Sequence, residues 1–213
     1  MGDVTSKTVS ESNRRGRPRS EEVERAILKA TATLLDERGL QALTIEDVAA
    51  LAKVGKTSIY RRWPSKGILA LEAFLSEFLL FQPPVDTGTL AGDLNAALSA
   101  WVGAVAGTAM GRTLVALIAE AQSDPELASE WSKRVVMTAR SQHRMMIDRA
   151  IARAEIPEDS DVDVLMDMLY GPAYHRLLQG HLPLTDGFVR EVVAVVVAGA
   201  KAGAAVPSSL HGE

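Results

Sequence analysis

The 213-residue chain contains no cysteine, and this absence excludes several kinds of chemistry at once. Without thiols there is no disulfide framework, no thiolate nucleophile and no cysteine-ligated zinc site. Aromatic residues make up only 5% of the chain, whereas apolar residues together make up 47%. That apolar share is enough for a sizeable core in one medium domain, or in a small module joined to a larger one.

Long apolar runs are also missing. The first thirty residues contain no apolar segment of the secretory type. One uncharged stretch, Leu94 to Gly111, is 18 residues long, but it is rich in alanine and contains three glycines and three further polar residues. A membrane-spanning helix needs roughly 20 strongly apolar residues. We therefore expect a cytoplasmic protein with no membrane partner.

The net charge of −4 argues mildly against a nucleic-acid partner, but the charge is unevenly distributed. Residues 1–67 contain 13 Lys and Arg against 9 Asp and Glu, whereas residues 68–213 contain 10 against 18. The first part is therefore basic by +4 and the second acidic by −8. Such an asymmetry indicates that the basic part binds nucleic acid. Residues 1–19 are polar, end in an arginine-rich run and are predicted to form a disordered basic arm.

Apolar residues recur with helical spacing along the rest of the chain. Residues 192–197 could also be read as a buried strand, but that strand would have no partner, so a helix is favoured. The sequence therefore predicts an all-α fold of about nine helices. The first helix is expected to begin after Ser20, a suitable N-cap, and to end near Gly39, a suitable residue after a helix. The others are expected over residues 44–52, 56–63, 65–81, 90–110, 112–122, 125–155, 161–179 and 188–203.

The most informative pattern is residues 44–66, which read as two short helices joined by a tight turn. Thr44 and Asp47 have the spacing of a capping box, and Ile59 and Trp63 share the apolar face of the second helix. The opposite face of that helix is basic and rich in hydroxyls: it carries Lys56, Thr57, Ser58, Tyr60, Arg61 and Arg62. A helix of this kind fits the DNA major groove, where Arg or Lys pairs with guanine. The pattern predicts a helix-turn-helix unit, with a solvated face on an ordinary helical hairpin as the alternative.

The same residues resemble the N-terminal domain of the TetR (tetracycline-repressor) family of bacterial regulators. The similarity extends over residues 20–80. It is most specific in the segments TIEDVA, at residues 44–49, and IYRRWPSK, at residues 59–66. In the family these positions read Thr-(Ile/Val)-x-x-(Ile/Val)-Ala and Leu-Tyr-x-x-Phe-x-Ser-Lys. The resemblance implies sequence-specific binding to double-stranded DNA.

The resemblance also implies contacts to the DNA backbone. Thr44 corresponds to a residue that caps the second helix and touches a phosphate, and Tyr60 to a tyrosine that reaches the backbone. Lys66 corresponds to a lysine at the start of the fourth helix, whose N-terminal amides favour a phosphate. One position departs from the family pattern: Gly55 stands where serine is frequent, so a side-chain cap and a phosphate contact are missing there.

Sequence recognition is implied for the second helix of the unit. The start of that helix, where bases and phosphates are met, corresponds to Lys56, Thr57 and Ser58. Arg61 and Arg62 correspond to a variable pair that selects the DNA sequence. In the basic arm, Arg17 and Arg19 are candidates for minor-groove contacts, with a solubilising tail as the alternative.

The remaining helices correspond to a dimerising, effector-binding core. Residues 161–179 and 186–203 are apolar nearly all round, so they must be covered on two sides. The resemblance implies that they form a homodimer interface, and a dimer suits a palindromic operator. The predicted domains are a disordered arm at 1–19, a DNA-binding unit at 20–66 linked through helix 65–81, a dimerisation and effector-binding domain at 67–205, and a tail at 206–213.

A pocket for a small apolar effector would be concave and mostly apolar, with a few polar groups. The candidate lining residues, which could also be plain core, are Trp101, Met110, Met137, His143, Met146, Tyr170 and Tyr174. The four histidines lack metal-ligand spacing, and no catalytic motif is present, so we predict no metal, no cofactor, no catalytic residue and no enzymatic activity. The sequence predicts a transcriptional repressor relieved by such an effector. A regulator of the same fold without an inducer, and a ligand-binding bundle that does not bind DNA, are the alternatives.

Overall fold

The computed structural model describes residues 16–77 and 85–202, and in these ranges it contains helices and no strands. The elements are α1 (Gly16–Ala42), α2 (Ile45–Ala52), α3 (Lys56–Tyr60), α4 (Lys66–Glu77), α5 (Leu90–Val105), α6 (Ala109–Ala121), α7 (Pro125–Trp131), the π-helical turn η2 (Ser132–Val136), α8 (Met137–Ala152), α9 (Val162–Gln179) and α10 (Asp186–Ala202). Because α7, η2 and α8 follow one another without a break, the described residues form nine helical units. The predicted all-α fold is confirmed.

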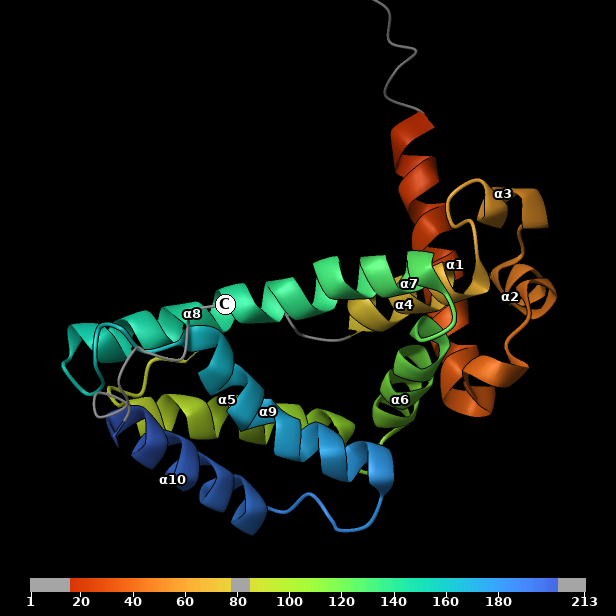
Figure 1. The fold of residues 1–213 in the computed structure, drawn as a ribbon. Coiled ribbons are helices and arrows are strands. Elements are labelled where there is room, and N and C mark those ends of the chain that lie inside the picture. The colour runs from red at the N-terminus through yellow and green to blue at the C-terminus, as the bar shows by residue number, and fades with distance from the viewer. Residues whose placement is uncertain (1–15, 78–84, 203–213) are drawn as a thin grey trace, which may run out of the picture.

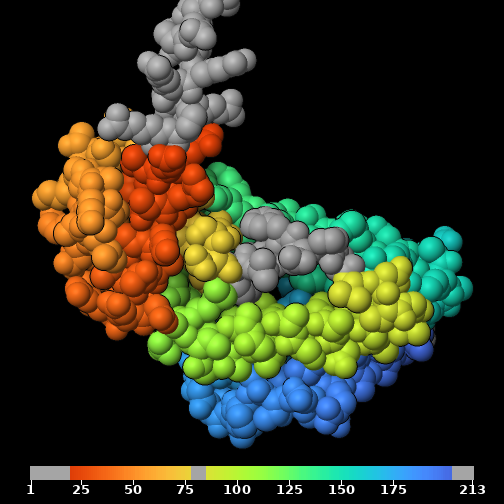
Figure 2. Space-filling model, turned by 180° about the vertical axis from the view of Figure 1, so that it is seen from behind, coloured from red at the N-terminus to blue at the C-terminus, as the bar shows by residue number. Residues whose placement is uncertain are grey.

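The helices are arranged as a small N-terminal group at one end of a larger C-terminal body (Figure 1). Helices α1, α2 and α3 lie together, and α4 and α6 both pack against α1. In the body, α5 packs against α8, α9 and α10. Seen from behind, the N-terminal helices form a lobe beside this body (Figure 2). The lobe and the body each have an apolar core, and Trp101 contacts both cores.

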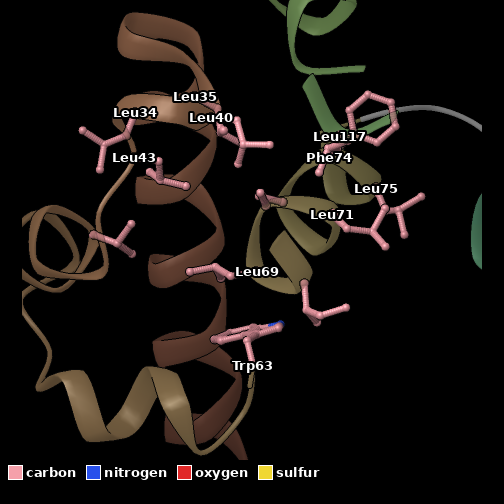
Figure 3. Packing of buried hydrophobic residues seen from close by; sticks show 14 of the residues in the cluster. Leu34, Leu35, Leu40, Leu43, Trp63, Leu69, Leu71, Phe74, Leu75 and Leu117 are labelled. Carbon is pink, nitrogen blue, oxygen red and sulfur yellow. The ribbon is translucent and has the colours of Figure 1, made fainter. Parts of the chain in front are cut away.

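The core of the N-terminal group explains why two very short helices are stable there. Ile59 is fully buried and Trp63 is 5% exposed, so both residues predicted to point inward do so. Figure 3 shows Trp63 and Leu69 where α4 passes α1. Isolated helices of five to eight residues are not stable in water, so burial against α1 and α4 holds α2 and α3 in place.

Several predicted helix limits are wrong. The helix expected over residues 56–63 ends at Tyr60, and the one expected from residue 112 begins at Ala109. Helix α1 begins at Gly16, so Ser20 lies inside it and does not cap it. Its backbone leaves the helical region at Gly39, where φ is +75°, as the C-terminal glycine predicted. The expected helix over residues 90–110 ends at Val105. A new helix starts after Thr108, whose Oγ1 accepts a hydrogen bond from the amide of Gly111 at 3.0 Å.

Only some of the predicted domain limits lie within the residues that the structure describes. The arm up to residue 15 and the tail at 206–213 lie outside the described residues. The core of the N-terminal group continues across residue 66 into α4, α6 and α7. Within the described ranges no single helix is long and apolar enough to cross a membrane. Helices α5 and α6 pass that test only as a pair, bent by 91°.

Candidate nucleic-acid interface and cavity

The turn between α2 and α3 is built by local hydrogen bonds and one unusual backbone conformation. Thr44 Oγ1 accepts from the amide of Asp47 at 3.1 Å and donates to its carboxylate at 2.9 Å, which confirms the predicted cap of α2. The left-handed residue in the turn is Lys53, with φ 55° and ψ 46°, whereas Gly55 is extended at φ −76°. Gly55 precedes α3 and provides no side-chain cap, as its lack of a side chain predicted.

The outer face of α3 is open to solvent and carries cations and hydroxyls. Lys56, Thr57, Tyr60 and Arg61 are exposed, and Ser58 is half-buried. Tyr60 is 53% exposed, which is unusual for a large aromatic side chain without a partner to cover it. The guanidinium of Arg61 makes no hydrogen bond or ion pair with any described residue. This face is therefore free to meet an anionic surface.

Lys56 is engaged by a carboxylate that the sequence reasoning overlooked. Its Nζ lies 2.7 Å from Oε1 of Glu46 in α2. The hydrogen bond between them lowers the pKa of Glu46 and raises the pKa of Lys56. The ten-residue separation gives no helical-spacing signal, because the contact crosses from α2 to α3. Glu46 fixes the direction of the lysine in the free protein.

Two further predicted DNA contacts are tied to the protein. Arg62 donates to the carbonyl of Ser58 at 3.0 Å and to Oγ of Ser20 at 2.9 Å, so it fastens α3 to α1. Lys66 Nζ donates to the carbonyl of Leu40 at 3.1 Å, where α1 ends. The side chains of Arg17 and Arg19 lie outside the described residues. The DNA contacts expected of Arg17 and Arg19, and those of the other residues predicted to contact DNA, stay predictions.

A second site is a cavity of about 930 Å³ lined by α4, α5, α6, α7, η2, α8 and α9. Five of the seven predicted pocket residues line it: Trp101, Met110, His143, Tyr170 and Tyr174. Met137 is 57% exposed, and Met146 is fully buried in the core of the C-terminal body, so neither lies on the cavity wall. Among the described residues, no group of histidines and carboxylates is arranged to hold a metal ion.

The polar side chains that line the cavity contact one another in pairs. Tyr170 Oη lies 2.7 Å from His143 Nε2, and the backbone of Ala139 provides the other hydrogen bond of the imidazole. Burial lowers the pKa of His143 to about 4 and raises the pKa of Tyr170. The rings of Trp101 and Tyr174 are 4.9 Å apart between centroids. Burial raises the pKa of Tyr174, and the nearby indole N–H of Trp101 partly offsets this rise.

The sequence reasoning also overlooked the charged lining residues. Arg140 of α8 lies 2.5 Å from Asp163 and 2.6 Å from Asp167, both in α9. These pairs join residues 23 and 27 positions apart in sequence, so they depend on how α8 packs on α9. The alanines of α5 were a usable signal. Ala96, Ala97, Ala100 and Ala104 share one face, and their small side chains leave room for the cavity.

Helix α4 connects the cavity to the N-terminal group through two contacts with the α7–η2 run. Arg134 of η2 makes a bidentate ion pair with Glu72 of α4, at 2.6 and 3.1 Å. The Phe74 ring of α4 packs on Trp131 at 6.0 Å between centroids, and both residues line the cavity. A change in the shape of the cavity can therefore reach α4 directly.

The fold and the exposed basic helix define a two-part, all-α protein with a helix-turn-helix unit for DNA. The chain matches the family described as "Bacterial regulatory proteins, tetR family" over residues 27–73. It matches "Tetracyclin repressor-like, C-terminal domain" over residues 84–196. The chain belongs to the TetR family of transcriptional regulators. Proteins of this family bind DNA and act as dimers, and the family is not one of enzymes.

Individual relatives agree with this assignment. The chain is 33% identical over 199 residues to the HTH-type transcriptional regulator YdeS of Bacillus subtilis, covering 92% of this chain and 98% of that protein. It is 31% identical over 170 residues to the DNA-binding transcriptional repressor TetR of Mycobacteroides abscessus, covering 79% and 88%.

Solved structures give the same result. The TetR family transcription regulator SCO0332 is 36% identical, with a TM-score of 0.73 over 84% of this chain and 98% of that one. The regulator FadR of Bacillus subtilis, solved in complex with stearoyl-CoA, shares the fold at a TM-score of 0.64 and 18% identity, over 82% and 98%. The chain is thus a DNA-binding transcriptional regulator.

Proposed function

We propose that the protein is a repressor that leaves its operator when a small apolar molecule occupies the cavity. The observation that carries this proposal is that α4 touches both sites. Phe74 of α4 lines the cavity, while Lys66 at the start of the helix holds the carbonyl of Leu40 beside the helix-turn-helix unit. A molecule that binds one position of α4 better than another shifts the population toward it. That shift would change the spacing of the two recognition helices in a dimer.

The proposed DNA surface is the exposed face of α3 with the starts of α2 and α4. Direct base contacts are assigned to Arg61 and to the first residues of α3. Backbone contacts are assigned to Thr44, Tyr60 and Lys66. Arg62 must release Ser20 before it can reach a base. The full set is Thr44, Lys56, Thr57, Ser58, Tyr60, Arg61, Arg62 and Lys66, with Arg17 and Arg19 from the arm.

The proposed dimer forms through α9 and α10, and thus through most of residues 161–179 and 186–203. Val164 and Met168 of α9 are 54% and 52% exposed, and Val195 of α10 is 63% exposed. Large apolar side chains this exposed on adjacent helices are typical of a surface that a partner covers. Two copies would then present two α3 helices to a palindromic operator. We place the protein in the cytoplasm because bacterial operator DNA is there.

The experiment is a mobility shift with the DNA upstream of the protein's own gene, against a random fragment of equal length. We expect a shift on the upstream fragment that weakens steeply with salt, and release of that DNA by a cavity ligand. If no salt-sensitive, sequence-specific shift occurs, the regulator does not act on this DNA. A specific shift that no cavity ligand reverses would favour a regulator without an inducer. Ligand binding with no shift on any DNA would favour a ligand-binding bundle.

A further inference from the structure

The wall of the cavity is formed mainly by aromatic rings and aliphatic carbon. Phe74, Trp101 and Trp131 lie on it together with Tyr170 and Tyr174, and the alanine face of α5 forms one side. The ring of Trp101 meets Tyr170 at an interplanar angle of 77° and Tyr174 at 54°. Tilted ring faces of this kind favour a flat aromatic guest, which can add edge-to-face and offset contacts.

The charges at the cavity do not favour an anion. The one cationic residue in the described lining, Arg140, already has two carboxylate partners, Asp163 and Asp167. The remaining charged lining residue is Glu77, which is exposed. A carboxylate or phosphate in the cavity would therefore lose its hydration without gaining a free cation. His143 adds no charge at neutral pH, because burial keeps its imidazole unprotonated.

The hydrogen bonds of the lining leave one acceptor and one donor for a guest. The neutral imidazole of His143 carries one proton. Because the ring hydrogen-bonds the backbone of Ala139 while its Nε2 faces Tyr170, we assign that proton to Nδ1. Its Nε2 must then accept, so Tyr170 donates to it and keeps only acceptor capacity at Oη. An indole can only donate, so Tyr174 accepts from Trp101 and keeps its own proton to donate.

We propose that the cavity binds an uncharged aromatic molecule that carries a hydroxyl group, which donates to Tyr170 and accepts from Tyr174. This inference rests on the proposed function, because it identifies the cavity as the effector site. A hydroxyl matches both free groups at once. An ether or a carboxylate can only accept, and a methyl group neither donates nor accepts, so each of them forgoes the hydrogen bond to Tyr170 that a hydroxyl makes.

The test compares four molecules that share one ring system: 9-anthracenemethanol, 9-methylanthracene, 9-anthracenecarboxylate and 9-(aminomethyl)anthracene. Their affinities for the full chain at pH 7 are measured from the anisotropy of anthracene fluorescence. We expect the alcohol to bind about tenfold more tightly than the methyl compound, the combined value of two modest hydrogen bonds. We expect the carboxylate to bind more weakly than both. Tightest binding of the carboxylate or of the ammonium compound, or binding of none of the four, would overturn the proposal.

Variants of the two tyrosines show whether their hydroxyls hydrogen-bond the ligand or only their rings pack against it. Tyr174→Phe and Tyr170→Phe are each expected to reduce the preference for the alcohol over the methyl compound to about threefold, since the ring and one of the two hydrogen bonds stay. Ser141→Ala, which removes an exposed hydroxyl of α8 outside the cavity and outside the DNA-binding unit, is the control and should keep the preference. An equal loss of affinity for both compounds would indicate a structural role only and would contradict the assignment.

The same titration is repeated with the upstream DNA bound, and this second readout distinguishes the two claims. If the alcohol binds with the expected preference but leaves the DNA complex intact, the ligand class stands and the effector function fails. If the carboxylate alone binds and releases the DNA, the effector function stands and the ligand class is wrong.

Discussion

Among single residues, the side chains predicted to contact DNA differ in how far the free protein already holds them. Glu46 holds Lys56, Ser20 and Ser58 hold Arg62, and the end of α1 holds Lys66. The Arg61 guanidinium has no such partner among the described residues. It can therefore meet a base without first breaking a contact.

Replacing Arg61 with alanine is expected to weaken specific DNA binding by roughly 1–3 kcal/mol and to relax the preference at one base pair. Binding to random DNA should change little, because a base contact contributes only where its base is present. The check is a competition titration with single-base operator variants. Arg112→Ala, at an exposed arginine of α6, is the control. An equal loss on operator and random DNA would contradict a base-reading role.

The buried imidazole of His143 makes the free energy of unfolding depend on pH. Its pKa is about 4 in the folded chain and about 6.5 as a free side chain, so the unfolded state binds a proton first as the pH falls. The stability it contributes is complete above pH 6.5 and is lost progressively toward pH 4. Lowering the pH from 7 to 5 is expected to cost roughly 2 kcal/mol through this residue.

Urea unfolding at pH 7 and pH 5 measures this loss. His143→Gln still offers an acceptor to Tyr170 but does not titrate, so its stability should vary less between the two pH values by that amount. His175→Gln, at an exposed histidine of α9, should behave as the parent chain does. A variant at position 143 with unchanged pH dependence would show that the burial of this imidazole is not maintained in solution.

At the scale of helices, the break between α5 and α6 depends on two glycines with different tasks. Gly107 has φ +70°, a conformation that other residues adopt with strain. A Cβ at Gly111 would collide with the backbone carbonyl of Val105. By contrast, a Cβ at Gly103, within α5, would meet nothing. Gly103, Gly107 and Gly111 are equally spaced along the sequence, but each has a different local environment in the structure.

Gly111→Ala is expected to destabilise the fold by about 1–3 kcal/mol, because the clash is with backbone and a flexible side chain cannot relieve it. Gly103→Ala should be neutral or should stabilise the fold by up to about 1 kcal/mol, since alanine is the better helix former. Thermal and urea unfolding of the two variants gives the comparison. If both variants have the same stability, the close approach at Gly111 is not present.

The coupling between cavity and DNA-binding unit is predicted to pass through η2. Arg134→Met removes the ion pair with Glu72 of α4. Ligand binding and DNA binding should each persist, while the effect of one on the other falls about fivefold, or roughly 1 kcal/mol of coupling. Operator affinity with and without the cavity ligand is the measurement. Lys133→Met, at the neighbouring exposed residue, which pairs with Glu130, should leave the coupling unchanged.

For the whole molecule, helical periodicity and caps were enough to predict nine helical units and the helix-turn-helix unit. The cap at Thr44 could be predicted because it depends on residues three apart. The pairing of Arg62 with Ser20 could not, because these residues are 42 positions apart and meet only when α3 packs on α1. The end of α5 was missed because no proline marks it.

The cavity illustrates the same limit. Periodicity shows which face of a helix is apolar, but not whether that face meets another helix or open space. Tyr170 lines the cavity, whereas Met146, equally apolar in pattern, is packed into the core. The charge asymmetry was the more reliable signal, because it needs no packing. Lys56 of α3 and Arg61, which caps the end of α3, are both exposed on the N-terminal group.

If the protein binds one DNA sequence as a symmetric dimer, hydroxyl-radical footprinting of the DNA upstream of its gene should show this. We predict two protected half-sites of inverted sequence on one face of the duplex, with centres one helical turn, about 10 base pairs, or a multiple of it apart. Uniform protection along the fragment, or a single unpaired half-site at saturating protein, would contradict it.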